Sequence, residues 1–166
     1  MLADVVIVDA VAADAAEILA LQKLAYLSEA ALYDEYTIPP LTQTMEGMLQ
    51  DIEEQVVLKA VLGGRIVGSV RARQPGDTCF IGRLIVHPEH QNRGIGASLM
   101  RAVEDRFSEA QRFELFTGDR STKNLSFYQK LGYEIARQGS LPNNVTLVYL
   151  QKDNDVHPGP PGGARG

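Results

Sequence analysis

The sequence has little of several things that specialised proteins need. Its 166 residues include one cysteine, Cys79, so the chain forms no internal disulfide and no thiolate metal cage. No apolar run exceeds five residues, whereas a membrane-spanning helix needs about 20. Acidic residues outnumber basic ones by 21 to 16, and the net charge of −5 argues against a dedicated nucleic-acid binder. These absences exclude a disulfide scaffold and a membrane-spanning helix, and they argue against a dedicated nucleic-acid binder.

What is present indicates one folded domain with a short tail. Hydrophobic residues make up 45% of the chain and charged residues 22%, which excludes disorder of the whole chain. Residues 153–166 are rich in proline and glycine, so we expect a folded domain over 1–152 and a flexible tail over 153–166. No basic leader with an apolar core is seen at the start, so a reducing cytoplasmic location is expected.

Hydrophobic periodicity predicts an alternating order of strands and helices. Gly63-Gly64 joins two apolar runs and predicts a tight hairpin, and Pro39-Pro40 predicts a break between the first two helices. Strands are expected at 5–8, 55–62, 65–73, 78–86, 113–117, 133–137 and 145–150, and helices at 14–31, 42–51, 95–107 and 121–131. A hairpin-rich first half followed by β–α–β–α–β favours a mixed sheet with helices on its faces.

The segment from Arg83 to Leu99 carries the clearest chemical signal. A buried strand leads into a loop rich in hydrogen-bond donors, and Gly94-x-Gly96 opens the next helix. Glycines there let a ligand approach the backbone, and the free N–H groups and dipole of a helix start attract an anion. Arg93 adds a full positive charge and Ser98 a hydroxyl. The pattern indicates a phosphate or pyrophosphate site.

Other interpretations of the glycine pair fit less well. A P-loop needs a Gly-Lys pair, which the chain lacks, and a dinucleotide-binding fingerprint needs a third glycine where Leu99 stands. A tight strand-to-helix turn without a ligand also remains open for an isolated G-x-G. The wider context favours the phosphate site.

That context is a resemblance to a known family. Gln91-Asn-Arg-Gly94-Ile-Gly96-Ala97, after a strand ending in Leu-Ile-Val-His-Pro, resembles the Q/R-x-x-G-x-G/A signature of the GNAT superfamily of acyl-CoA-dependent N-acetyltransferases. A second segment, Asn124–Tyr133, resembles the family's N-x-x-x-x-Y-x-x-x-G-[FY] helix. The resemblance implies an α/β (α+β) fold with a mixed, mostly antiparallel sheet of six to seven strands and about four helices.

The resemblance also implies where acetyl-CoA binds. Two parallel strands, 78–86 and 113–117, would splay apart to admit the pantetheine arm beside Ile85 and Val86. The backbone N–H near Val86 would polarise the thioester carbonyl. The remaining cofactor-binding residues would be Gln91, Asn92, Arg93, Gly94, Ile95, Gly96, Ala97, Ser98, Asn124 and Tyr128.

The implied reaction is direct attack of a primary amine on acetyl-CoA, with Tyr128 as the catalytic acid for the departing sulfur. The position of Tyr128 four residues after Asn124 places both on one helix face, which favours this role over a packing role. Many family members carry a glutamate on the strand before the phosphate loop, but 78–86 contains no carboxylate. A general base is therefore left unassigned, and a non-catalytic acyl-CoA-binding sensor or regulatory domain is the alternative.

The acceptor is expected to be a small-molecule or peptide amine. The stretch from Glu29 to Tyr36 carries three carboxylates and two tyrosines where the family builds its acceptor wall. Asp34 and Glu35 are the substrate-binding candidates, and a cationic amine would suit them, although a solvated helix end explains the same residues. A homodimer is common in the family.

No metal cofactor is expected. His87 and His90 are three residues apart but lack a third ligand at a suitable spacing. Cys79 lies on a predicted buried strand, where a small apolar role is favoured over a nucleophilic one.

Overall fold

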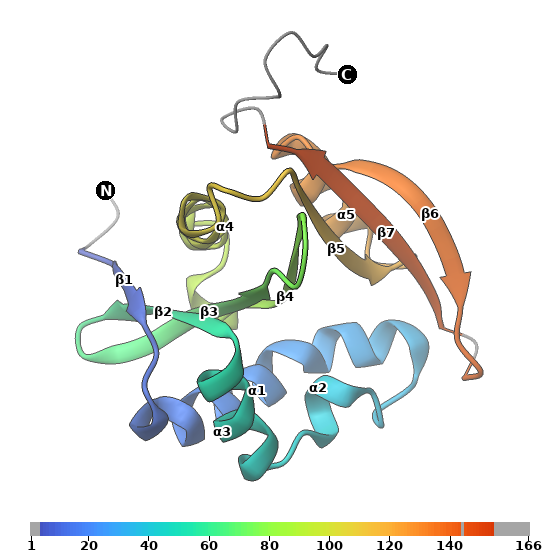
Figure 1. The fold of residues 1–166 in the computed structure, drawn as a ribbon. Coiled ribbons are helices and arrows are strands. Elements are labelled where there is room, and N and C mark those ends of the chain that lie inside the picture. Colours follow the sequence, from blue (N-terminus) through green and yellow to red (C-terminus); the bar gives the residue numbers. More distant parts are fainter. Residues whose placement is uncertain (1–3, 144, 155–166) are drawn as a thin grey trace, which may run out of the picture.

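The computed structural model describes residues 4–143 and 145–154 and contains one seven-stranded sheet (Figure 1). The strand order is β1-β2-β3-β4-β5-β7-β6, and β4 and β5 form the one parallel pair among the described residues. The strands are β1 (Val6–Asp9), β2 (Val56–Leu62), β3 (Arg65–Arg73), β4 (Thr78–Val86), β5 (Arg112–Gly118), β6 (Glu134–Ser140) and β7 (Thr146–Asp153). The predicted mixed, mostly antiparallel sheet is confirmed.

Helices cover both faces of this sheet (Figure 1). The α-helices are α1 (Ala15–Tyr33), α2 (Pro39–Thr42), α3 (Met45–Glu54), α4 (Ile95–Arg106) and α5 (Thr122–Lys130), with short 3₁₀ turns at Ala12–Asp14 and Pro88–His90. Leu99 and Val103 of α4 share a buried cluster with Tyr128 of α5, whereas Ile18 of α1 and Met48 of α3 belong to a second cluster. The sheet therefore has an α4/α5 face and an α1–α3 face.

Local chemistry explains most of these boundaries. Gly63 and Gly64 have φ of 57° and 78°, the left-handed conformation that a two-residue hairpin of this type requires. Contrary to the predicted break, Pro39 opens the short helix α2, because proline fits the first turn of a helix. The helix expected at 42–51 begins at Met45 instead. Thr44 caps it by accepting a 3.1 Å hydrogen bond from the N–H of Gly47.

The end of the described chain is more ordered than its composition indicates. β7 continues through Asp153, and Asn154 is 5% exposed and donates to the carbonyls of Ser108 and Ala110 at 3.0 and 2.8 Å. The folded domain thus extends past residue 152, and the rest of the predicted tail, 155–166, lies outside the described residues.

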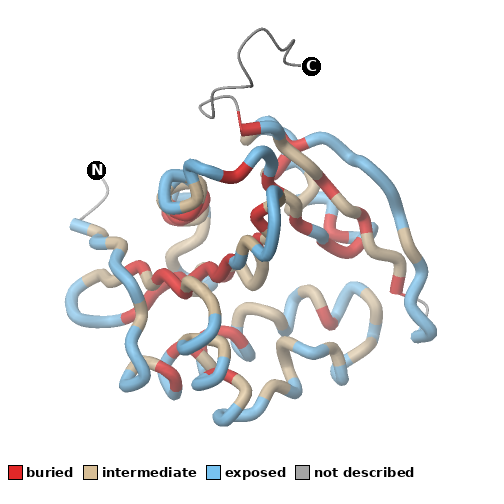
Figure 2. The backbone as a smooth tube through the Cα atoms, viewed as in Figure 1, coloured by how far each residue is buried: buried red, intermediate tan, exposed pale blue. Residues whose placement is uncertain are grey.

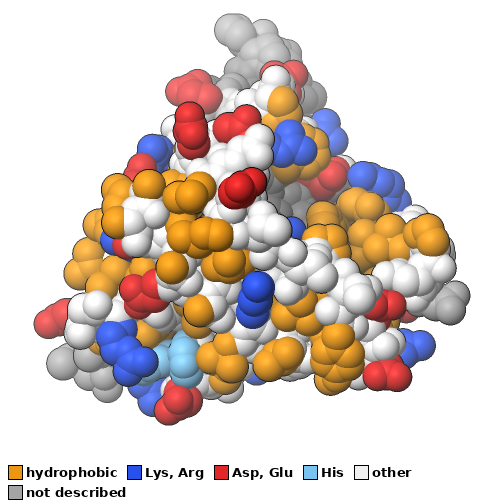
Figure 3. Space-filling model, turned by 90° about the horizontal axis from the view of Figure 1, so that it is seen from below, with side chains coloured by type: hydrophobic (Ala, Val, Ile, Leu, Met, Phe, Trp, Pro, Cys, Tyr) orange, Lys and Arg blue, Asp and Glu red, His pale blue; other side chains and the backbone are white. Residues whose placement is uncertain are grey.

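Burial is concentrated along the central strands and the inner sides of the helices (Figure 2). Seen from below in Figure 3, apolar side chains cover much of the molecule's surface, and charged ones stand singly or in small groups. Leu24 and Leu27 of α1 and Leu49 of α3 are among the exposed apolar side chains. No helix in residues 4–143 and 145–154 is long and apolar enough to cross a membrane.

Candidate active site

The two parallel strands separate soon after they meet. β4 and β5 pair at Thr78–Arg112, Cys79–Phe113 and Phe80–Glu114, and no later pair follows. Opposite β3, an extra residue enters β4 near Arg83, whose φ of 51° is left-handed. A bulge of this kind bends a strand and redirects its side chains. The bulge therefore accounts for the opening between the strands at which the resemblance places pantetheine.

The free edge of β4 carries an available backbone donor. The N–H of His87 donates to the carbonyl of Val67 on β3 at 2.8 Å. Successive backbone N–H groups of an extended strand point to opposite sides. The N–H of Val86 is thus directed away from β3, toward the side from which β5 has diverged.

The start of α4 follows this edge directly. Gly94 is the N-cap residue, with φ of 84°, and no side chain caps the helix. The N–H of Ser98 donates to the Gly94 carbonyl at 3.0 Å, as expected for the first turn of the helix. The N–H groups of Ile95, Gly96 and Ala97 precede that bond, so they are the ones a helix start leaves without intrahelical partners. The chain meets the requirements for holding a pyrophosphate there.

Side chains from two elements hold the loop before α4 in place. Gln91 donates to the Val86 carbonyl at 3.3 Å, and Lys123 of α5 donates to the Gln91 side-chain oxygen at 3.2 Å. Asn92 has a left-handed φ of 64°, and Arg93 lies on the exposed side, 3.4 Å from His90. A Cβ on Gly96 would come within 3.3 Å of the Phe127 ring, so α4 and α5 approach closely at this point.

Asn124 and Tyr128 both lie on α5, as the spacing predicts. The Asn124 amide makes long contacts of 3.4 Å to the Thr117 hydroxyl and 3.5 Å to the Glu29 carboxylate. The Tyr128 ring is 8% exposed and packs edge-on against Phe127 and Tyr133. No described residue hydrogen-bonds its hydroxyl, yet the described chain has no buried side-chain oxygen without a partner. The Tyr128 hydroxyl therefore has no partner among the described residues and is not fully enclosed, although the ring that carries it is buried.

Burial also sets the protonation state of Tyr128. Burial, followed by the proximity of Tyr26 and Glu29, raises the pKa of its hydroxyl well above the ordinary value. The phenol stays protonated throughout the physiological range. It can therefore donate a proton and cannot act as a base.

The C-terminal half of α1 closes the site from the other face. The Ser121 hydroxyl donates to Glu29 at 2.8 Å, Tyr33 donates to Asp119 at 3.0 Å, and the Arg120 N–H donates to the Tyr33 oxygen at 2.7 Å. Gly118 is required beneath Tyr33, because a Cβ there would lie 2.7 Å from the tyrosine Cζ. Burial raises the pKa of Glu29, and the Ser121 hydrogen bond opposes that shift.

The predicted substrate residues lie farther along the same stretch. Asp34 ends α1 in a left-handed conformation (φ 49°) and is exposed. Glu35 accepts hydrogen bonds from the N–H and hydroxyl of Thr37, which lower the pKa of its carboxyl. Of the three acidic side chains in the stretch, Glu29 is the one that contacts α5. Its position on α1, seven residues after the buried Gln22 and four before Tyr33, places it on the inner helix face and is the sequence signal for this role.

An uncovered aromatic floor lies beside the opening. β5 is an internal strand, but Phe116 is 57% exposed. The centroid of its ring lies 5.7 Å from that of Tyr149 on β7. The guanidinium carbon of Arg137 lies over the Tyr149 ring, 4.2 Å from its centroid. An acceptor approaching the opening would therefore meet an aromatic surface, whose two rings are tilted by 51° to each other. Neither ring was expected at the site from the sequence.

Other candidate groups have structural partners. Cys79 is fully buried, as predicted, and burial raises its thiol pKa to about 12. His87 accepts from the Glu89 N–H at 3.1 Å, which caps the 3₁₀ turn. Among the described residues, no group of three or more side chains could hold a metal ion.

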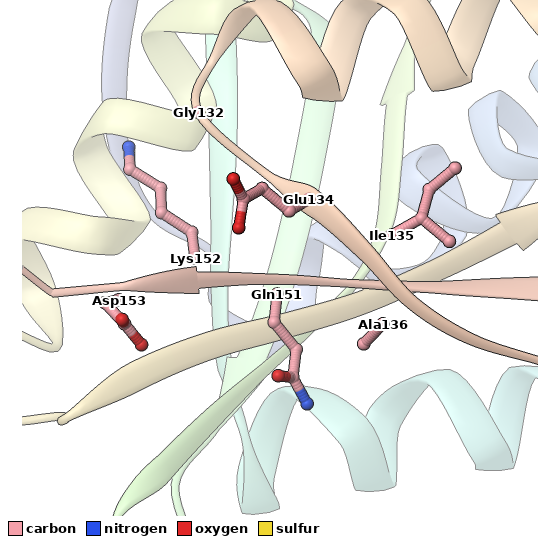
Figure 4. A pocket seen from close by; sticks show the side chains of 7 residues that line it. All are labelled: Gly132, Glu134, Ile135, Ala136, Gln151, Lys152 and Asp153. Atoms are coloured by element: carbon pink, nitrogen blue, oxygen red, sulfur yellow. The ribbon is translucent and has the colours of Figure 1, made fainter. Parts of the chain in front are cut away.

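A hollow of about 200 Å³ lies along β6 and β7, next to the glycine that follows α5 (Figure 4). It is lined by Glu134, Ile135 and Ala136 of β6 and Gln151, Lys152 and Asp153 of β7. Lys152 is engaged by Glu104 at 3.0 Å and Gln151 by Glu114 at 3.0 Å. Gly132, the glycine of the second motif, also lines the hollow, and the other six residues belong to neither motif.

Comparison with known sequences identifies the family. Residues 19–133 match the Acetyltransferase (GNAT) family, and the chain belongs to that family. Protein YqkA of Bacillus subtilis is 29% identical over 122 residues, which cover 74% of this chain and 35% of YqkA. Protein YdhI of the same organism is 33% identical over 84 residues, which cover 49% of this chain and 50% of YdhI. The chain thus spans about a third to a half of these relatives.

Solved structures with the same fold include acetyltransferases of known ligand or acceptor. PaiA N-acetyltransferase from Thermoplasma acidophilum, in complex with coenzyme A, gives a TM-score of 0.76 at 15% identity, covering 90% of this chain and 99% of that one. The structure of yncA from Salmonella typhimurium, with its cofactor acetyl-CoA, gives a TM-score of 0.74 at 19% identity and covers 95% of this chain and 98% of yncA. The Escherichia coli ribosomal-protein-S18-alanine N-acetyltransferase gives a TM-score of 0.77 at 11% identity, and the match covers 95% of this chain and 97% of that one. These likenesses establish the fold.

Proposed function

We propose that this protein transfers the acetyl group of acetyl-CoA to a primary amine. The observation that carries the proposal is the coincidence, at one opening, of an uncapped helix start, an outward-directed strand N–H and an unpartnered phenol. Two structural neighbours, PaiA and yncA, were solved with coenzyme A and acetyl-CoA. Family membership and these ligands support acetyl-CoA as the cosubstrate.

The residues that would hold acetyl-CoA follow the order of the molecule from its phosphates to its thioester. The backbone from Gln91 to Ala97, with Arg93 and Ser98, would hold the pyrophosphate. The backbone of Ile85 and Val86 would pair with the pantetheine arm as an added strand, and the Asn124 amide would bond that arm from α5. When bound, acetyl-CoA supplies an acetyl group as a reactive thioester.

The chain's own groups then assist one displacement. The Val86 N–H would donate to the carbonyl oxygen as negative charge develops on it. A neutral amine nitrogen forms the new bond to the carbonyl carbon, the carbon–sulfur bond breaks, and Tyr128 passes its proton to the departing sulfur. Because β4 holds no carboxylate, the amine would lose its proton to water or to a residue outside that strand.

A two-stage experiment tests this function. Calorimetric titration should show binding of acetyl-CoA but not of NAD or ATP, and incubation with an amine panel should then release free thiol. Binding without thiol release for any amine would favour the acyl-CoA sensor instead. Absence of acetyl-CoA binding would contradict both.

A further inference from the structure

A polar network lies between β4 and the α1–α3 helices, beside the opening. Arg71 of β3 is 7% exposed, forms an ion pair with Asp51 and donates to the Gln22 oxygen at 2.6 Å. Gln22 is fully buried and donates to Gln43 at 2.9 Å. Arg83 of β4 enters the same network from the bulge. Buried polar groups of this kind need partners, and most of these have them.

Arg83 is the member with the weakest partnership. Its one hydrogen bond in the described chain, 3.1 Å long, runs to the Gln43 side-chain oxygen. That oxygen also accepts from Gln22 and, at 3.3 Å, from Arg71, so three donors share one carbonyl. A guanidinium has five N–H donors and matches the two oxygens of a carboxylate. Arg83 is half-buried and forms no ion pair with any described carboxylate.

The charges of the network do not balance. Two guanidinium groups, of Arg71 and Arg83, face one carboxylate, that of Asp51. Burial and the nearby Arg83 charge both lower the pKa of Arg71, because the two cations lie close enough to repel each other. A cluster with one excess positive charge and free donors is suited to a monoanion.

This cluster lies close to the reacting groups. Arg83 precedes Val86 by three residues on β4, about 10 Å along a strand at ~3.3 Å per residue. Tyr26 of α1 is influenced by the charges of both Arg83 and Glu29, and Tyr128 is influenced by Tyr26 and Glu29. On α1, Gln22 bonds the Gln43 side chain that Arg83 contacts, and Glu29, seven residues or about two turns (~10 Å) later, bonds Ser121 at the start of α5, the helix that carries Tyr128. The order from the opening outward is therefore Tyr128, Glu29, then Arg83, with Tyr26 between Gln22 and Glu29 on α1. A small molecule could span these groups.

We propose that the acceptor amine also carries a carboxylate, which Arg83 binds while Glu29 faces the amine end. The inference rests on the proposed acetyl transfer and names its substrate class as an amino acid. The oppositely charged ends of the acceptor meet oppositely charged side chains, which fixes its direction. Tyr26 lies between the two ends.

Matched pairs of amines test the proposal. Amino acids with increasing separation between amine and carboxylate (glycine, β-alanine and γ-aminobutyrate) would be compared with their carboxamides as acceptors. We expect kcat/KM to be about 10- to 100-fold higher for at least one amino acid than for its amide, the effect of one charge-assisted contact. Equal use of both members of every pair, or preference for a peptide N-terminus, would overturn the proposal.

Variants separate binding from support of the fold. Arg83→Gln should raise KM for the preferred amino acid about 10- to 100-fold and leave kcat/KM for its amide unchanged. Arg83→Lys should retain part of the preference, and Arg65→Gln, at an exposed arginine of β3, should retain all of it. An equal loss for acid and amide in Arg83→Gln would show a structural role only.

Product binding gives a readout that needs no turnover. N-acetylated amino acids and their amides would be titrated into the coenzyme A complex and followed by NMR. The wild-type protein should bind the acid more tightly than the amide, and Arg83→Gln should bind both alike. If coenzyme A binds and no N-acetylated amino acid binds more tightly than its amide, the inferred amino-acid acceptor is wrong and the proposed acetyl transfer still stands. If neither coenzyme A nor acetyl-CoA binds, the proposed function itself is wrong.

Discussion

The two faces of the sheet differ in how their functional groups are specified. On the α4/α5 face, the site is built largely from backbone: an uncapped helix start, a left-handed Gly94 and a strand edge. On the α1–α3 face it is built from side chains far apart in sequence, such as Glu29 with Ser121 and Tyr33 with Asp119. The part of the site on the first face depends on the residues of a short continuous segment, and the part on the second face depends on pairs of residues far apart in the sequence. Substitutions on the two faces should therefore fail in different ways.

The largest effect on acetyl-CoA binding is expected from valine in place of the loop glycines. Gly94→Val forces a branched residue into φ of 84°, at a strain cost of ~1–3 kcal/mol, and Gly96→Val also presses on Phe127. Both should weaken acetyl-CoA binding at least ~100-fold, measured by calorimetry, with the fold retained. Gly76→Val, in a turn with open space around it, is the control. Binding within twofold of wild type in either variant would remove this loop from the phosphate site.

An intermediate effect is expected where the two faces meet. Gly118→Ala places a Cβ 2.7 Å from the Tyr33 Cζ and should displace the end of α1 from β5. Acceptor KM should rise about tenfold, with acetyl-CoA affinity changed much less. The double variant Gly118→Ala/Tyr33→Ala removes the clash and should recover part of the loss. A double variant no better than Gly118→Ala would contradict this account of the contact.

A smaller effect is expected from the outer acidic residues. Reversing charge at Asp34 and Glu35 together should raise KM for a cationic amine several-fold, and added salt should shrink the difference, because both residues are accessible to solvent. Acetyl-CoA KM should not change. An unchanged acceptor KM would show that these residues are only a solvated helix end.

The smallest effect concerns stability. Burial raises the pKa of Glu29 in the folded state above its ordinary value near 4.3. The folded protein therefore loses stability as the pH rises from that ordinary value through the raised pKa of the folded state. Glu29→Gln should raise Tm at pH 7 by at most a few degrees, at about 2–4 °C per kcal/mol. The gain should vanish below about pH 4.

Activity completes that test. Glu29→Gln should lower acceptor turnover while it raises Tm, and Glu53→Gln, at an exposed position, should change neither. A lower Tm at pH 7 would show that the ionised carboxylate stabilises the fold.

The same comparison explains what the sequence could predict. The strand at Thr78–Val86, the Gly63-Gly64 hairpin and the order of elements follow from periodicity and glycine chemistry, and the structure confirms them. The predicted start of α3 was wrong by three residues, because Thr42 belongs to the short helix α2 and Thr44 is the residue that caps α3. Arg83 was visible only as the one charge on its strand. Its partners Gln43 and Arg71 are 40 and 12 residues away, and no local pattern connects them.

In the proposed mechanism, the phenol of Tyr128 serves the chemistry rather than the binding of acetyl-CoA. The measurement that tests it most directly is the kcat of Tyr128→Phe beside its calorimetric Kd for acetyl-CoA. Loss of a general acid should lower kcat ~10²–10⁴-fold, and Kd should stay within about twofold, because the buried ring and its contacts remain. A weakened Kd with kcat intact would contradict the account and make Tyr128 a packing or binding residue.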